Sequence, residues 1–287
     1  MTGRGIPYYT VDAFTDTPFG GNPAAVCLEI DDLSDSAMAR IAAEMNLSET
    51  AFVYAADGGG ERRLRWFTPV AEVPLCGHAT LASAHVLLRE AGLPQPVRFQ
   101  SLSGPLVVSE EDGRLRMDFP ANPPSEALMP AGLAEALGIG GGDGTGPRTA
   151  SSAAPPATFT TSGKVALVVV GTEAEVLSIR PDFGALGRVR LPGGVMGVAV
   201  TAPGAEPHVD FVSRFFAPWL GVDEDPVTGV AHTTLTPYWS AVLGKAEMAA
   251  RQRSARGGEL TVRARGDRVE LVGQAVTVAA GNMVRPG

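Results

Sequence analysis

"PLCGHATLASAHVLL" (residues 74–88) and "DPVTGVAHTTLTPYW" (residues 225–239) are two matching stretches that decide the fold. Each has a proline, then a glycine, then small and hydroxyl residues, then an apolar run of helical period. Each predicts a helix whose first residues, Gly77 and Gly229, let a ligand approach unpaired backbone N–H groups. Either stretch alone could be an ordinary loop-to-helix junction, but their repetition predicts two related lobes whose helix starts face each other.

Short alternating strands surround both stretches, and turn residues separate them. The Pro-rich segment "PANPPSEALMP" marks the crossing between two domains, because it breaks the strand pattern. We therefore predict an α+β protein of two similar β-rich lobes, each around one main helix. The lobes are expected to span residues 1–121 plus about 272–287, and residues 122–271. Strands are expected at 8–14, 24–28, 50–55, 63–67, 99–102, 105–109, 115–119, 167–171 and 197–201, with helices at 35–45 and 77–90 and a hairpin turn at 266–267.

Bulk composition excludes several classes of protein. The chain has 287 residues and a net charge of -8, and it lacks the clustered Lys and Arg that nucleic-acid binding requires. It has no run of about 18 apolar residues, so no membrane span is expected. Cys27 and Cys76 form no CxxC pair, and a disulfide between them stays open. The first residues lack the apolar core of a signal peptide, so the default expectation is a soluble cytoplasmic protein.

Glu49 lies in "NLSETAF" (residues 46–52), among small and apolar neighbours. A carboxylate there could be a cap, a solvated turn residue or a group whose pKa is tuned for catalysis. Asp225 precedes Pro226, which holds it extended, and it could be a turn residue or point toward the second helix start. His78, at the first helix start, could cap the helix, hydrogen-bond to Asp225 or Glu49, or shuttle a proton.

Several other chemistries lack their sequence signals. The four histidines have no metal-ligand spacing, so no metal is expected. There is no G-x-S-x-G elbow and no nucleotide-binding glycine fingerprint. Cys76 could have a lowered pKa at a helix start, yet no second thiol precedes Gly229. A two-thiol racemase is therefore disfavoured, and Cys76 is expected to be a small buried residue.

Six blocks in order make the chain resemble the PhzF-like family of phenazine-biosynthesis-type isomerases. They are "VDAFTDTPFGGNPAAV", "NLSETAFV", "RWFTPVAEVPLCGHATLASAHVL", "MDFPANPP", "DFVSRFFAPWLGVDEDPVTG" and the ending "RGGEL…GDRVELVGQAVTV". The resemblance covers nearly the whole chain and is weakest from about 137 to 165. It implies a diaminopimelate epimerase-like fold with a pseudo-twofold axis, an active site between the lobes, no cofactor and a homodimer.

The resemblance also assigns roles to residues of this chain. Glu49 matches the family's proton-transfer glutamate, and His78 and Asp225 match polar residues of its cleft. Three further matches concern substrate binding: Asn22 lies close to the substrate, and Gly77 and Gly229 are the helix-start glycines.

One position departs from the family pattern, because Val230 stands where the family usually has a serine. The change removes a hydroxyl donor at the second helix start, so the substrate can differ from that of phenazine assembly. The favoured function is a cofactor-independent isomerase of a small carboxylated metabolite, acting through Glu49. The alternative is a non-catalytic small-acid binder or assembly protein on the same fold. The Gly/Pro-rich stretch within 138–163 is expected to be a flexible loop, with a lid as the second interpretation.

Overall fold

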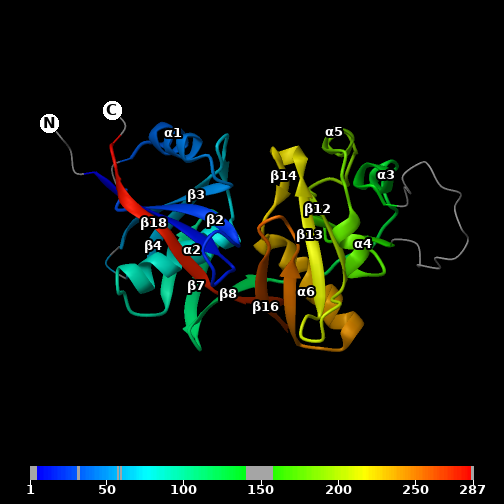
Figure 1. The fold of residues 1–287 in the computed structure, drawn as a ribbon. Helices are drawn as coiled ribbons and strands as arrows, with labels where there is room; N and C mark the ends of the chain where they lie inside the picture. Colours follow the sequence, from blue (N-terminus) through cyan, green and yellow to red (C-terminus); the bar gives the residue numbers. More distant parts are fainter. Residues whose placement is uncertain (1–4, 31–32, 57, 59, 140–157, 286–287) are drawn as a thin grey trace, which may run out of the picture.

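Two lobes lie side by side in the computed structural model, each built of strands around one long helix (Figure 1). The structure describes residues 5–30, 33–56, 58, 60–139 and 158–285. The first lobe surrounds α2 and the second surrounds α6. The helices are α1 (Asp35–Met45), α2 (Gly77–His85) with its π-helical extension η1 (Val86–Glu90), α3 (Leu133–Leu137), α4 (Glu173–Ser178), α5 (Phe183–Leu186), the 3₁₀ turn η2 (Pro218–Leu220) and α6 (Gly229–Leu243).

The first lobe has a regular alternation of strand pairings. β1 pairs antiparallel with β2, β2 parallel with β3, β3 antiparallel with β4, β4 parallel with β6, and β6, β7 and β8 follow antiparallel. The two parallel pairs need crossovers, which α1 and α2 provide. The strands are β1 (Ile6–Ala13), β2 (Asn22–Leu28), β3 (Glu49–Ala56), β4 (Arg62–Phe67), β5 (Glu72–Val73), β6 (Val97–Ser101), β7 (Gly104–Glu111) and β8 (Arg114–Pro120).

The second lobe repeats this alternation. β10 pairs antiparallel with β11, β11 parallel with β12, β12 antiparallel with β13, β13 parallel with β15, and β15, β16 and β17 follow antiparallel. Helices α4 and α5 occupy the first crossover and α6 the second. The strands are β9 (Ser125–Glu126), β10 (Thr158–Thr161), β11 (Val165–Val169), β12 (Gly197–Pro203), β13 (Phe211–Ala217), β14 (Val222–Asp225), β15 (Glu247–Gln252), β16 (Gly258–Arg265), β17 (Arg268–Gly273) and β18 (Ala275–Met283).

The two lobes are joined in the sheet, and β18, although it follows β17 of the second lobe in the chain, belongs to the first lobe. β8 pairs antiparallel with β17, β9 pairs with β10 of the second lobe, and β18 returns to pair with β1 of the first. In Figure 1, β18 lies beside the strands of the first lobe although it ends the chain. This pairing supports the division expected from the sequence, and we propose residues 1–121 plus about 272–287, and 122–271, as the two lobes.

Small residues allow α2 to pass through the centre of its lobe. Residues 77–84 of α2 are all buried, and most are Gly, Ala, Ser or Thr. The main apolar core is continuous between the lobes, since Trp66 and Leu81 of the first belong to one cluster with Leu235 and Trp239 of the second. Two smaller clusters lie beneath α1 and beneath α3, α4 and α5. The lobe contact is therefore part of the packed interior.

The strand and helix positions expected from the sequence agree with the structure within a few residues. The hairpin turn lies at 266–267, where Gly266 has φ 67°. One expectation is wrong at its end: residues 158–161, assigned to a flexible loop, form β10 between β9 and β11. The remaining candidate lid residues, 140–157, lie outside the described part. Among described residues, no helix is long and apolar enough to cross a membrane.

Candidate active site

Glu49 is the first residue of β3, opposite Ala24 of β2 in the parallel pairing. Its side chain is 19% exposed, so it reaches solvent while its surroundings are largely protein. Burial and, to a smaller extent, the nearby charge of Asp225 raise the pKa of Glu49 to about 8, against the opposing effect of a hydrogen bond with Cys76. Glu49 is therefore protonated at neutral pH and can lose its proton slightly above it.

His78 lies beside Glu49 as a neutral imidazole. Its Nε2 is 3.4 Å from Glu49 Oε2 and has no hydrogen-bond partner among the described residues. Burial lowers the pKa of His78 to about 3, so the ring stays uncharged. Its Nδ1 lies 3.1 Å from the amide nitrogen of Asn22 and 3.5 Å from the sulfur of Cys76. The Asn22 amide gives both of its hydrogens to Asp225 and Val227, and the neutral ring faces Glu49 with its Nε2.

Asn22 connects the two lobes at this point. It is fully buried at the start of β2, and its Nδ2 donates to Asp225 Oδ1 at 2.8 Å and to the Val227 carbonyl at 2.9 Å. These two acceptors fix the orientation of the amide, since the opposite one would face oxygen against oxygen. The Oδ1 of Asn22 has no hydrogen-bond partner among the described residues. It is therefore the polar atom of this buried amide that is left unsatisfied within the described part of the chain.

Asp225 ends β14 and receives a hydrogen bond on each carboxylate oxygen. Asn22 donates to Oδ1, and the Thr228 hydroxyl donates to Oδ2. Burial raises the pKa of Asp225 to about 6, and these two hydrogen bonds limit the rise because they favour the ionised form. At neutral pH, Asp225 is the charged carboxylate and Glu49 the neutral acid.

The starts of α2 and α6 touch through their glycines. A Cβ at Gly77 would lie 3.1 Å from the Cα of Gly229, and a Cβ at Gly229 would lie equally close to the Cα of Gly77. Neither helix has a side-chain cap hydrogen bond, so backbone N–H groups at both starts stay available. Both helices direct positive partial charge toward this point, which favours an anionic group of a ligand.

Two residues of the site were not expected from the sequence. The Gln252 side chain is buried, and its Nε2 donates to the Asp225 carbonyl at 2.7 Å and to Thr228 Oγ1 at 3.1 Å. Its Oε1 accepts from the Thr228 N–H at 2.9 Å. Thr228 could have been found from its place in "DPVTG", but Gln252 lies in "RQRSARGG", which carries no local signal.

Glu49, Cys76 and His78 could in principle hold a metal ion, since their ligand atoms lie within 4.8 Å of one another. Two observations oppose such a site. The positive ends of α2 and α6 converge on this point, and burial raises the pKa of the Cys76 thiol well above its usual value. Cys76 and Cys27 are both free, so the disulfide left open by the sequence is not formed.

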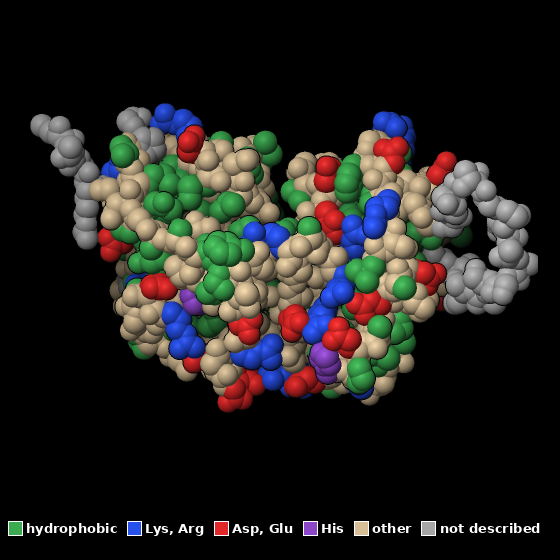
Figure 2. Space-filling view, viewed as in Figure 1, with side chains coloured by type: hydrophobic (Ala, Val, Ile, Leu, Met, Phe, Trp, Pro, Cys, Tyr) green, Lys and Arg blue, Asp and Glu red, His purple; other side chains and the backbone are tan. Residues whose placement is uncertain are grey.

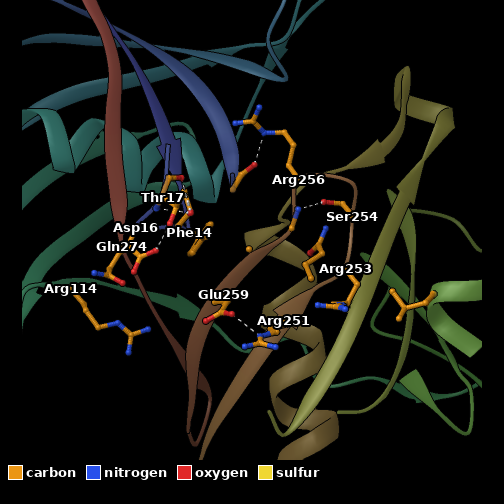
Figure 3. A pocket seen from close by; sticks show the side chains of 16 residues that line it. Phe14, Asp16, Thr17, Arg114, Arg251, Arg253, Ser254, Arg256, Glu259 and Gln274 are labelled. Carbon is orange, nitrogen blue, oxygen red and sulfur yellow. Dashed lines mark hydrogen bonds and ion pairs between the residues drawn. The ribbon is translucent and has the colours of Figure 1, made fainter. Parts of the chain in front are cut away.

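A cleft of about 630 Å³ opens between the lobes next to this cluster (Figure 3). Gln252 lines it, but Glu49, His78 and Asp225 do not. The space-filling view shows the surface hollowed between the lobes, with basic side chains along this line (Figure 2). The cleft lining includes Arg114, Arg251, Arg253 and Arg256.

The structure brings most of the residues proposed from the sequence into one cluster. Glu49, His78, Asn22 and Asp225 form a continuous set of contacts, and Gly77 meets Gly229 beside them. His78 does not cap its helix and reaches Asp225 only through Asn22. Val230, the second residue of α6, is half-buried at the second helix start.

Comparison with known proteins places this arrangement in context. Residues 11–281 match the family described as phenazine biosynthesis-like protein. A relative in Pseudomonas aeruginosa, named an uncharacterized isomerase, is 48% identical over 97% of this chain and 98% of its own. A crystal structure of a PhzF family protein from Enterococcus faecalis has a TM-score of 0.85 at 40% identity, covering 96% of this chain and 98% of that one. A hydroxyproline epimerase from Agrobacterium vitis shares the fold alone, with a TM-score of 0.56 at 12% identity, covering 98% of this chain and 92% of that one.

Proposed function

This chain belongs to the phenazine biosynthesis-like family, and we propose that it is an isomerase that moves a proton on a small carboxylated metabolite through Glu49. The family and fold are those of isomerases and epimerases. One observation carries the finer proposal: the raised-pKa carboxyl group of Glu49 lies 3.4 Å from a neutral His78 imidazole, where two uncapped helix starts meet.

The two carboxyl groups hold one proton between them near neutral pH. With pKa values of about 8 for Glu49 and about 6 for Asp225, the proton resides on Glu49. Glu49 can donate this proton to one carbon of the substrate and then remove a proton from another, or act in the reverse order. The hydrogen count and the oxidation level of the substrate stay unchanged, so we propose that the reaction needs no cofactor.

His78 and Asn22 have supporting roles in this proposal. The Nε2 of His78 and the Oδ1 of Asn22 are buried polar atoms without a hydrogen-bond partner in the described chain, and in this proposal they bind polar groups of the substrate. Asp225 stays charged and keeps the proton on Glu49 by repelling its ionised form. The backbone N–H groups at the starts of α2 and α6 would bind the substrate carboxylate.

Deuterium exchange in heavy water tests the proposal. Wild type and Glu49→Gln are incubated with dihydro-hydroxyanthranilate and a panel of small cyclic and amino acids, and NMR follows label incorporation. Removing the general acid–base group is expected to lower exchange by about 10²–10⁴-fold. Glu44→Gln, at an exposed position of α1, is the matched control and should keep full exchange. Full exchange by a folded Glu49→Gln would refute the role of Glu49.

A non-catalytic small-acid binder is the second candidate, because Val230 removes a hydroxyl at the second helix start. A ligand that binds wild type without any exchange or product would favour it. A thiol-dependent racemase is the third, and Cys76→Ser with unchanged exchange would exclude it. A homodimer and a cytoplasmic location stay predictions.

A further inference from the structure

Residues 252–258 run from the last residue of β15 to the first residue of β16. They contact both the segment of Asp225 and the turn before Asn22, and we call them the clasp. We propose that Gln252 and Arg256 of the clasp are positioning residues, which hold Asn22 against Asp225 across the contact between the lobes. This inference rests on the proposed function, since it concerns the same proton-transfer site. The Asn22–Asp225 contact joins residues 203 positions apart in the chain, so its geometry depends on what fixes the two segments.

The first half of the clasp holds the segment that carries Asp225. Gln252 contacts the Asp225 carbonyl, the Thr228 N–H and the Thr228 hydroxyl. Because Gln252 donates to that hydroxyl, the hydroxyl is left to donate to Asp225 Oδ2. Ser254 Oγ also donates to the Pro226 carbonyl at 2.9 Å. Gln252 and Ser254 thus anchor the loop before α6 at Asp225, Pro226 and Thr228.

The second half of the clasp holds the turn that precedes Asn22. Arg256 donates to the carbonyls of Gly21 at 2.9 Å and Gly20 at 2.8 Å, and to Asp12 Oδ1 at 2.7 Å. Asp12 is 1% exposed, and its other oxygen accepts the Phe19 N–H at 2.7 Å. In Figure 3, Arg256 extends from the second lobe toward the first. One guanidinium group therefore fixes both strands of the β1–β2 turn immediately before Asn22.

Steric constraints show that the clasp is closely fitted to both segments. A Cβ at Gly258 would lie 2.3 Å from Val227 Cγ2 and 2.9 Å from the carbonyl oxygen of Phe14. The neighbouring Glu259 N–H donates to the same Phe14 carbonyl at 3.0 Å. The clasp thus touches the Val227 side chain of one lobe and the Phe14 backbone of the other, and any shift in it moves both.

Loss of the clasp should change the two carboxyl groups in opposite directions. If the Asn22 turn is released, Asp225 loses a hydrogen bond that favours its ionised form, so its pKa rises. A neutral Asp225 no longer repels the ionised form of Glu49, so the pKa of Glu49 falls. The other titratable groups at this pair are Cys76 and His78 at the start of α2. His232 of α6 contacts the Thr228 carbonyl through its Nδ1.

Carbon-13 NMR titration of the full chain, labelled at Asp and Glu carboxyl carbons, measures both pKa values without a substrate. Arg256→Met is expected to raise the pKa of Asp225 by about 1 and to lower that of Glu49. Arg256→Lys keeps the charge beside Asp12 but loses the bridging fork, so it should give a smaller change of the same sign. Gln252→Met should raise the pKa of Asp225, because Thr228 loses its orientation.

Arg251→Met is the matched control, because Arg251 lines the same cleft and pairs with Glu206 and Glu259 without touching the site. It should leave both pKa values unchanged. Unchanged values in folded Arg256→Lys and Gln252→Met would overturn the proposal, even if Arg256→Met fails to fold. Opposite pKa shifts in the variants, found together with a wild type that shows no turnover, would support the clasp while refuting the proposed function. With an active wild type, the clasp variants should lower kcat more than they raise KM.

Discussion

The two lobes share one strand pattern, but only the first has a carboxyl group at the start of the parallel strand that follows its first crossover. The parallel pairing of β2 and β3 begins with Ala24 opposite Glu49, and that of β11 and β12 begins with Val165 opposite Gly197. A side chain at Gly197 would meet Phe215 Cζ at 2.4 Å and the Phe216 carbonyl at 2.7 Å. The second lobe therefore has no room for a counterpart of Glu49.

The helix starts show the same contrast in a milder form. Both keep glycine, because each faces the Cα of the other, but the flanking residues differ: Cys76 and His78 in the first, Thr228 and Val230 in the second. Backbone contact has preserved the geometry in both lobes, while the acid–base groups of these positions lie in one. The asymmetry favours one residue acting in both proton steps over two bases facing each other.

Asp225→Asn tests this contrast between the lobes, and we expect it to lower activity more than the other substitutions below. Without a charge opposite Glu49, the pKa of Glu49 falls from about 8, so less of the protonated acid is present at neutral pH. We expect exchange at pH 7.5 to drop by about 10-fold, because a pKa lowered by about 1–2 leaves only about a tenth of Glu49 protonated at that pH. Rates measured from pH 5 to 9 should also lose the acidic limb near pH 6 and move the alkaline limb downward. Asp223→Asn, on the exposed part of β14, should behave as wild type.

Gly77→Ala and Gly229→Ala test whether the helix contact is truly symmetric. Each added methyl group would lie 3.1 Å from a backbone Cα that cannot rotate away. Each should lower the free energy of unfolding by about 1–3 kcal/mol, with similar values for the two variants. Urea denaturation measures this, and a large cost at one position with none at the other would contradict the symmetry. Gly193→Ala is the matched control, because a Cβ there would meet open space, and it should leave the free energy of unfolding nearly unchanged.

The pH dependence of stability should reveal the burial of Glu49 in the first lobe. The pKa of Glu49 is raised from 4.5 to about 8, so the folded state binds more protons than the unfolded state in that range. Its stabilisation is complete below pH 4.5 and is lost as the pH rises toward 8. Glu49→Gln should reduce this loss by about 1–3 kcal/mol. Thermal unfolding of both proteins at pH 5 and pH 9 measures the difference, and parallel curves would contradict the burial argument.

Val230→Ser should have the smallest effect, because it restores one hydroxyl at the second helix start without touching the acid–base groups. A hydrogen bond to the substrate would contribute about 1 kcal/mol, which corresponds to about fivefold in KM. The kcat should stay nearly unchanged. A larger change in kcat than in KM would mean that position 230 takes part in the proton transfer, and the contrast between the helix starts would be weaker than we infer.

Most of the local structure could be predicted from the sequence, since apolar alternation and turn residues mark the strands. The repeated helix starts indicated the lobes, and the "SET", "GHAT" and "DPVTG" motifs indicated Glu49, His78 and Asp225. The clasp could not be predicted, because Gln252 and Arg256 act through contacts with segments 24 to 244 positions away. The short strand β10 could not be predicted, because it ends a Gly/Pro/Ser/Thr-rich stretch. Its partner strand β9 also lies far before it in the chain.

The return of β18 to the first lobe has a consequence for synthesis on the ribosome. β1 is flanked by β2 on one side and by β18 on the other, and β18 residues 275–283 follow the whole second lobe in the chain. Until they emerge, one edge of β1 stays open, and unpaired edges attract other chains. The lobe that is made first is thus completed only after the second lobe has been made.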